Sequence, residues 1–109
     1  MHETISSFGD FNNTKSNSLA VLFYFSHDDC NVCKILKPKI YELLQNEFPK
    51  IKFRYVDIKK TPEVSAQNNI FTVPTLLIYF EGKEFVRRSR NIGITELKNL
   101  IERPYKMMF

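Results

Sequence analysis

The sequence predicts an α/β fold with a mixed central sheet of about four strands and helices on both faces of the sheet. Two apolar runs, residues 19–26 and 51–58, are typical of strands, and each precedes a segment that we predict to be helical. Two further runs, residues 75–80 and 83–88, are separated by a two-residue turn and indicate a β-hairpin. Because helical connections favour parallel strands and a hairpin gives antiparallel ones, the sheet should be mixed.

The longest predicted helix covers residues 31–48, where apolar side chains recur every three or four positions. Pro38 lies inside this segment and should kink the helix, since proline lacks an N–H and clashes with the preceding turn. A short helix should begin at Thr61-Pro62, with the threonine hydroxyl as its cap, and end by Asn68-Asn69.

The N-terminal region is polar and only weakly patterned. Ile5, Phe8 and Phe11 have the spacing of a short helix, although Gly9 disfavours it. Residues 12–18 are rich in asparagine, serine and threonine, so we expect a loop there.

The last predicted helix opens at Gly93, and we expect Pro104 to stop it. The apolar tail that follows should either dock on the domain or fray. A chain of this length forms one domain, residues 1–109, and we expect residues 1–6 and 104–109 to be terminal extensions.

Composition excludes several classes of protein. The net charge is +4, but only Arg87, Arg88 and Arg90 cluster, so we interpret them as a solvated strand face and expect no nucleic-acid partner.

No apolar run is long enough to cross a bilayer, and the first residues lack the basic and apolar regions of a signal peptide. Two cysteines are too few for a disulfide-stapled scaffold. We therefore expect a cytoplasmic monomer without a membrane partner.

The chemistry is concentrated in Cys30-Asn31-Val32-Cys33, where the strand at residues 19–26 leads into the longest helix. At a helix N-terminus, free backbone N–H groups and the helix dipole favour a thiolate over a thiol, so Cys30 should be activated. Cys33 lies one turn further on, shielded by the helix and close enough to form a disulfide with Cys30. An exposed thiolate beside a buried partner is what thiol–disulfide exchange requires.

A metal site and an inert structural pair are the alternatives for the two cysteines. His27 extends the motif to His-x-x-Cys-x-x-Cys, which could supply three zinc ligands, but the sequence offers no evident fourth ligand. We therefore expect no metal and interpret His27 as a rim residue. Asp28 and Asp29 are interpreted as helix caps, or alternatively as negative charges that oppose thiolate formation at Cys30.

Together with the strand and helix around the cysteines, two prolines give a pattern that resembles the thioredoxin family. Pro38 follows Cys33 by five residues, and Val73-Pro74-Thr75 precedes the hairpin; the resemblance covers about residues 7–103. It implies a thioredoxin fold, with Cys30 attacking a substrate disulfide and Cys33 resolving the intermediate. It also implies that the Val73–Pro74 bond is cis, that Pro74 packs against the cysteines, and that Val73 offers backbone groups to an extended substrate. We assign Asp29, Val73 and Pro74 to substrate binding.

The chain departs from the usual thioredoxin pattern in several places. It contains no tryptophan, and Asn31-Val32 replaces the usual Gly-Pro between the cysteines. The buried acid of the family, thought to relay a proton to the resolving cysteine, falls on Tyr24, and its lysine partner falls near Tyr55. The first strand is shortened to at most His2–Ile5.

The resemblance and the motif together predict a thiol–disulfide oxidoreductase, specifically a protein disulfide reductase. Its partners should be disulfide-containing protein substrates and a separate reductase that recycles it. We expect no cofactor beyond the redox-active Cys30–Cys33 disulfide, because three widely spaced glycines cannot form a nucleotide-binding loop. The alternative is a thioredoxin-fold binding module whose redox state tunes partner affinity without much turnover.

Overall fold

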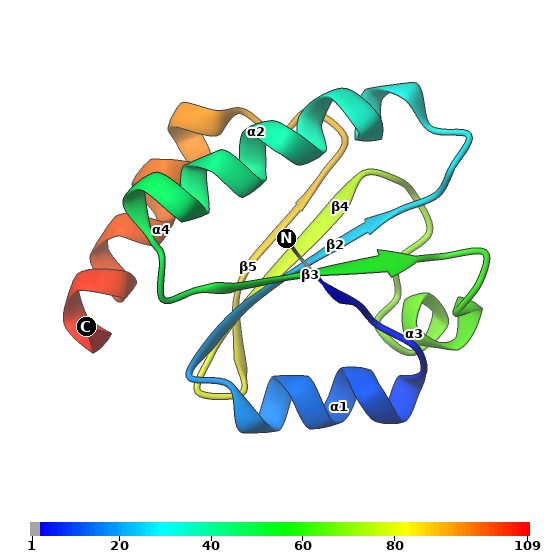
Figure 1. Cartoon of the computed structure of the whole chain (residues 1–109), viewed down its shortest axis with the longest axis horizontal. Helices are drawn as coiled ribbons and strands as arrows, with labels where there is room; N and C mark the ends of the chain where they lie inside the picture. The colour runs from blue at the N-terminus through cyan, green and yellow to red at the C-terminus, as the bar shows by residue number, and fades with distance from the viewer. Residues whose placement is uncertain (1–2) are drawn as a thin grey trace.

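One mixed sheet organises residues 3–109, the part of the chain that the computed structural model describes. The strand order is β1-β3-β2-β4-β5; β1, β3 and β2 are parallel, whereas β4 is antiparallel to β2 and β5 (Figure 1). The elements in chain order are β1 (Glu3–Thr4), α1 (Phe8–Asn17), β2 (Ala20–Ser26), α2 (Asn31–Glu47), β3 (Lys52–Asp57), α3 (Pro62–Gln67), β4 (Thr75–Phe80), β5 (Lys83–Ser89) and α4 (Ile94–Met108).

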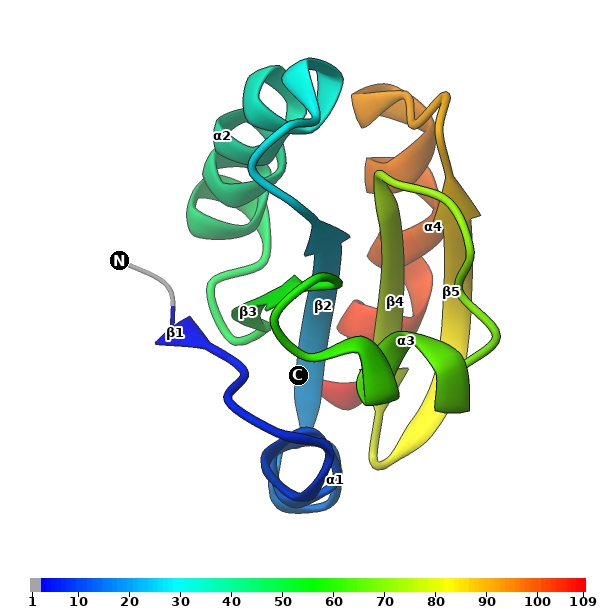
Figure 2. The same cartoon turned by 90° about the vertical axis from the view of Figure 1, so that its right-hand side faces the viewer.

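The predicted mixed sheet of about four strands is confirmed by β2 to β5, and β1 adds a two-residue edge strand. Figures 1 and 2 show α2 and α4 on one face of the sheet and α1 and α3 on the other. His2, which we included in the shortened first strand, lies outside the described residues. Among those described, no helix is both long and apolar enough to cross a membrane.

The central strand β2 is buried along its whole length because helices cover both faces of the sheet. Its side chains alternate: Leu22 and Tyr24 belong to the core between the sheet and α2 and α4, whereas Phe23 and Phe25 belong to the core beside α1. This explains why residues 20–26 form a nearly continuous apolar run instead of alternating apolar and polar residues.

The loop that we expected for residues 12–18 is wrong, since α1 continues to Asn17. Ser7 caps the helix by accepting a hydrogen bond from the Asp10 N–H at 3.0 Å, which satisfies a free donor of the first turn. Phe11 packs the same helix against the sheet, with its ring centroid 4.3 Å from that of Phe23. Capping and core packing therefore outweigh the loop preference of asparagine and serine.

Pro104 does not stop the last helix, contrary to our expectation, because α4 runs through it to Met108. Proline cannot donate the helical hydrogen bond, but the turn after Pro104 makes tertiary contacts. The Tyr105 ring packs against that of Phe48, with the ring centroids 5.0 Å apart. The Tyr105 hydroxyl accepts a hydrogen bond from the Lys50 N–H at 3.1 Å. Residues 104–108 are thus part of α4, and at the other end Ile5 is buried in the core beside α1.

The other predicted helices are found with small changes. Pro38 lies inside α2 as expected, and Asn69 adopts a left-handed conformation with φ of 56° after α3. Thr61 is the cap residue of α3, but the expected hydroxyl cap is wrong. Its Oγ1 donates instead to the Asp57 carbonyl at 2.9 Å, which fastens the β3–α3 turn.

Candidate active site at the start of α2

The Cys30–Cys33 disulfide lies where β2 has ended and α2 begins. The two sulfurs are bonded at 2.12 Å, and the Cα atoms are 5.2 Å apart. Cys30 itself caps α2, because its Sγ accepts a hydrogen bond from the Cys33 N–H at 3.2 Å. The interpretation of Asp28 and Asp29 as caps of this helix is therefore wrong: the sulfur occupies the place that a capping carboxylate would take.

The two sulfurs differ in access. The Cys30 side chain is partly exposed, whereas only 1% of Cys33 is exposed. The difference arises because Cys30 stands outside the helix, while Cys33 faces the core between the sheet and α2. An incoming molecule therefore meets Cys30 first.

The turn before Cys30 is closed by local hydrogen bonds. The Cys30 N–H donates to the His27 carbonyl at 3.2 Å, and the Asp29 N–H donates to His27 Nδ1 at 3.1 Å. His27 therefore hydrogen-bonds to the backbone of the turn through both its ring and its carbonyl. Among residues 3–109, no three His, Cys, Asp or Glu side chains are grouped so that they could hold a metal ion.

Tyr24 lies beneath Cys33 and donates its hydroxyl proton to the Cys33 carbonyl at 2.8 Å. Burial, and secondarily the neighbouring Tyr55, raise the pKa of Tyr24 far above its ordinary value. The hydroxyl therefore remains a protonated donor that anchors the α2 backbone. It does not replace the proton-accepting carboxylate of the resembled family.

Tyr55 pairs with Tyr24 across the parallel strands β2 and β3, with ring centroids 6.4 Å apart. The Lys37 ammonium lies 4.3 Å from the Tyr55 ring centroid, in a cation–π contact. Lys37 is one helical turn beyond Cys33, and burial lowers its pKa. An amine from α2 therefore lies beside the position where the family pattern places a lysine on β3.

Asp29 forms an ion pair with Lys59, whose Nζ lies 2.6 Å from Oδ2 of Asp29. The hydrogen bond from Lys59 lowers the pKa of Asp29, and the same bond raises the pKa of Lys59. Buried Asp57 shapes the turn that carries Lys59, because its Oδ1 accepts the N–H groups of Lys59 and Lys60. The negative charge beside Cys30 is therefore matched by a positive one from the β3–α3 connection.

The Val73–Pro74 peptide bond is cis, as the resemblance implied. Pro74 is buried, and its carbonyl accepts a hydrogen bond from the Arg90 N–H at 2.7 Å. Val73 and Cys30 both pack against the core between the sheet and α2 and α4. Val73, next to the cis-proline, and Cys30 of the disulfide thus pack against the same core. The Asp29 side chain, in contrast, is largely exposed and paired with Lys59.

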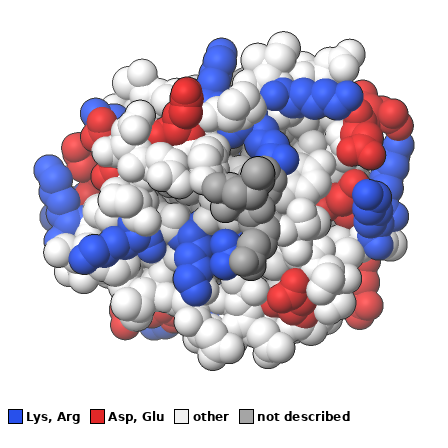
Figure 3. Space-filling model, viewed as in Figure 1, with Lys and Arg blue, Asp and Glu red and all other residues white. Residues whose placement is uncertain are grey.

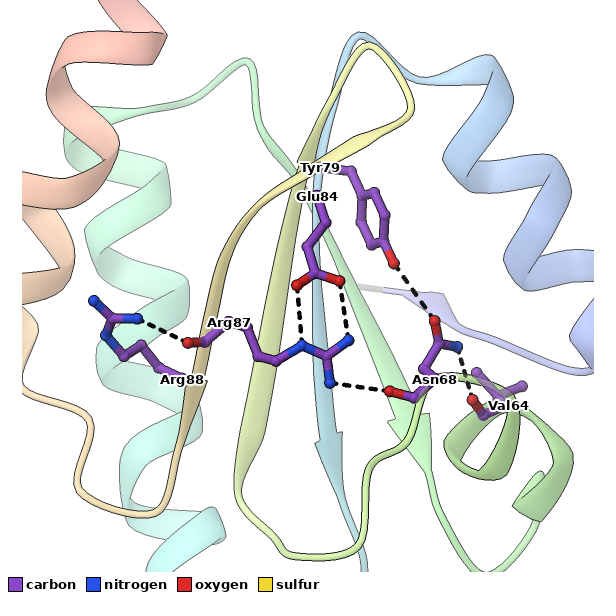
Figure 4. A network of polar contacts seen from close by, with 6 residues as sticks. All are labelled: Val64, Asn68, Tyr79, Glu84, Arg87 and Arg88. Atoms are coloured by element: carbon purple, nitrogen blue, oxygen red, sulfur yellow. Dashed lines mark hydrogen bonds and ion pairs between the residues drawn. The ribbon is translucent and has the colours of Figure 1, made fainter.

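The segment that leads to Pro74 is tied to β5 by the network in Figure 4. Arg87 makes two hydrogen bonds of 2.9 Å to the Glu84 carboxylate and a third, also 2.9 Å, to the Asn68 carbonyl. Asn68 in turn donates through Nδ2 to the Val64 carbonyl at 2.7 Å. The end of α3 is therefore fixed to the sheet a few residues before the proline loop. Arg87, one of the clustered arginines, has a structural role here.

Sequence reasoning missed Lys37, Lys59 and Arg90 as neighbours of this site. A signal existed for Lys59, because parallel strands bring the ends of residues 19–26 and 51–58 to the same edge of the sheet. Arg90 could not be placed, since its position depends on the hydrogen bond to Pro74 and on a left-handed φ of 62°.

The site combines a cysteine pair at a helix start, with one accessible sulfur, and a cis-proline loop on a mixed sheet. These features define a thiol–disulfide oxidoreductase of the thioredoxin fold. The comparisons agree. The thioredoxin family model matches residues 4–103. A thioredoxin-like protein, YdfQ of Bacillus subtilis, is 31% identical over 84 residues, which are 77% of this chain and 74% of that protein. The thioredoxin of Chlamydia trachomatis is 33% identical over 82 residues, or 75% and 76% of the two chains.

Solved structures of thioredoxins support the same family assignment. A thioredoxin from Plasmodium falciparum superposes with a TM-score of 0.82 at 27% identity, covering 93% of this chain and 97% of the other. Thioredoxin 1 of Thermosipho africanus gives a TM-score of 0.73 at 36% identity, covering 81% and 97%. The chain belongs to the thioredoxin family and is a thiol–disulfide oxidoreductase.

Proposed function

We propose that this protein is a protein disulfide reductase in which Cys30 is the nucleophile and Cys33 the resolving cysteine. The observation that carries the assignment is the unequal access of the two sulfurs: Cys30 is partly exposed at the helix start, whereas only 1% of Cys33 is exposed. A substrate disulfide can therefore reach Cys30, and Cys33 is limited to attack on a sulfur already held there.

The reaction begins with the reduced protein. The Cys30 thiolate attacks one sulfur of the substrate disulfide, forming a mixed disulfide and releasing the other substrate sulfur as a thiolate, which takes up a proton. Cys33, after losing its proton to solvent, attacks Cys30 Sγ. The Cys30–Cys33 disulfide forms and the second substrate thiolate leaves. Two electrons pass from the cysteine pair to the substrate, and a separate reductase must return them.

The surroundings support this division of roles. The Cys33 N–H already points at Cys30 Sγ, and this donor together with the α2 N-terminus favours negative charge on that sulfur. Val73 packs against the same core as Cys30. Val73 and Pro74 are proposed to receive an extended substrate segment, with Asp29 at its edge. The cysteine pair is the only redox group that this proposal requires, and we expect the protein to work as a monomer in a reducing compartment such as the cytoplasm.

The test is reduction of insulin disulfides by the protein with dithiothreitol as electron source. Wild type should accelerate insulin precipitation, and both Cys30→Ser and Cys33→Ser should fall to the rate of dithiothreitol alone. With a disulfide-containing peptide, Cys33→Ser should accumulate a mixed disulfide detectable by mass spectrometry, whereas Cys30→Ser should not. Each variant is the matched control of the other, because the chain has no third cysteine.

Two results would contradict the proposal. Equal trapping by the two variants would refute the assignment of nucleophile and resolving cysteine. Tight binding of disulfide peptides by wild type without acceleration of insulin reduction would favour the binding-module alternative.

A further inference from the structure

A hollow lies beside the cysteine motif, between α2 and the connection from β5 to α4. It has a volume of about 280 Å³, and its lining includes Val32, Ile35 and Lys39 of α2 and Arg90 and Ile92 of the connection. We call this hollow the rim groove. Val32 lies between the two cysteines in the chain, and the N–H of Arg90 binds the Pro74 carbonyl at 2.7 Å. The rim groove therefore adjoins both the disulfide and the proline loop.

The α2 wall of the rim groove is apolar and open to solvent. Val32 and Ile35 are 61% and 63% exposed, although both belong to a helix whose opposite face is fully packed. Exposed aliphatic side chains that gather beside a reactive residue indicate a surface that another molecule covers.

The rim groove also carries two cations, Lys39 and Arg90. Among the described residues, neither has an acidic partner within ion-pair distance, whereas Arg87 contacts Glu84 and Arg88 contacts Glu96. Asp28 and Asp29, the acids next to Cys30 in sequence, do not line the groove, and Asp29 is bound to Lys59. The groove therefore combines an apolar wall with two free positive charges.

We propose that the rim groove binds the residues beside the reacting cysteine of a protein substrate and selects segments that carry an apolar side chain next to a carboxylate. The apolar side chain covers Val32 and Ile35, and the carboxylate contacts Arg90 and Lys39. This inference rests on the proposed reductase function, since it concerns which disulfides react fastest. Charge complementarity decides the chemistry of the partner: a basic segment would place like charges together.

The experiment uses short peptides with a single cysteine activated as a thiopyridyl disulfide. The Cys30 thiolate attacks the peptide sulfur, a new disulfide forms, and thiopyridine leaves and is measured by absorbance. Three peptides are identical except for Glu, Gln or Lys next to a leucine that flanks the cysteine. At low ionic strength we expect the Glu peptide to react about fivefold faster than the Gln peptide. The factor is modest because each exposed ion pair, with Arg90 or with Lys39, contributes only a small binding free energy. The Lys peptide should be slowest, and the differences should shrink in about 0.5 M salt.

Variants assign the effect to the two cations. Arg90→Gln and Lys39→Gln should each bring the Glu-to-Gln rate ratio closer to one, whereas Arg90→Lys should retain the preference. Arg103→Gln removes an exposed cation of α4 outside the rim groove, and it should leave the ratio unchanged. If Arg90→Gln is poorly folded, Lys39→Gln on the exposed face of α2 decides the test.

The outcomes separate this inference from the reductase proposal. Small neutral dithiodipyridine serves as the reference for thiol reactivity, and failure of Cys30 to react with it would count against the reductase proposal. Normal reaction with dithiodipyridine but equal rates for the Glu, Gln and Lys peptides would overturn the rim-groove inference alone. A Glu preference that survives the combined Arg90→Gln and Lys39→Gln substitutions would overturn it as well.

Discussion

At the scale of single residues, the charge beside Cys30 depends on a partner that is far away in sequence. Asp29 alone would oppose a thiolate at Cys30, but Lys59 lies 2.6 Å from its carboxylate. Both side chains are largely exposed, so the pair contributes little to stability. Its importance is local, because the sum of the two charges acts on the neighbouring sulfur.

We predict that Asp29→Asn speeds the reaction of Cys30 with iodoacetamide in the reduced protein near pH 6, since Lys59 is then left as an unbalanced cation. Lys59→Gln should slow the reaction, and the double variant should return close to wild type. The measurement is the alkylation rate of each protein between pH 6 and 8, at low and high salt. The differences should diminish at high salt. If both single variants react like wild type, the pair is too far from the sulfur to matter.

At the scale of elements, packing decides where the helices at the two ends of the chain start and stop. α1 contains residues that prefer loops, yet Phe11 and the Ser7 cap extend it to Asn17. α4 contains Pro104 and nevertheless continues, because Tyr105 packs on Phe48 and binds the Lys50 N–H. Local propensity is worth about 1 to 3 kcal/mol for a glycine or proline, so a few tertiary contacts can outweigh it.

Tyr105→Ala should therefore loosen the last turn of α4 specifically. We expect the amides of residues 105–109 to exchange with solvent faster, and the free energy of unfolding to fall by about 1 to 3 kcal/mol through lost ring packing. Hydrogen exchange followed by mass spectrometry, together with urea unfolding, measures both effects. The control is Arg103→Ala, which truncates an exposed side chain two residues earlier. Unchanged protection of residues 105–109 in Tyr105→Ala would show that the contacts with Phe48 and Lys50 do not hold this turn.

At the scale of the whole molecule, the two cores on either side of the sheet are rich in aromatic rings, and several of these are tyrosines. Burial is the largest cause that raises the pKa of Tyr24, Tyr55 and Tyr79. The charged side chains lie on the surface. Basic and acidic side chains are interspersed on the face shown in Figure 3, outside the grey residues. The titration of these tyrosines should therefore contribute to the response to alkaline pH.

We predict that the oxidised protein keeps its stability up to about pH 10 and loses it progressively above that value. The unfolded chain releases its tyrosine protons near pH 10, whereas in the folded state the raised pKa values retain them. Each such tyrosine then lowers the free energy of unfolding by at most about 1.4 kcal/mol per pH unit. Urea unfolding between pH 8 and 11 measures this slope.

The oxidised form suits this measurement, because its two cysteines are paired and the disulfide cannot reshuffle through a free thiolate. Tyr24→Phe is the matched variant. It should be less stable by about 1 kcal/mol at pH 8 through the lost hydrogen bond to the Cys33 carbonyl. Its stability should also fall less steeply above pH 10. The same slope in wild type and Tyr24→Phe would mean that Tyr24 ionises no differently in the folded and unfolded chains.

The sequence by itself determined the sheet, the helix that follows the motif and the cysteine pair at its start. Those features depend on local periodicity and on spacing along the chain: the buried run at residues 19–26, the helical repeat after Cys30 and the Val73-Pro74-Thr75 segment before the hairpin. Each of them is expressed within a few neighbouring residues, and this is the range over which a pattern can be recognised.

Only the tertiary structure decided the surroundings of the cysteines. Lys59 pairs with Asp29 across 30 positions of the chain, Arg90 reaches Pro74 from the end of β5, and Cys30 caps α2 in place of the aspartates. It also decided that α4 passes through Pro104. These features share one physical reason: their energies come from groups that chain folding brings together, and no local pattern specifies which distant side chain will be the partner.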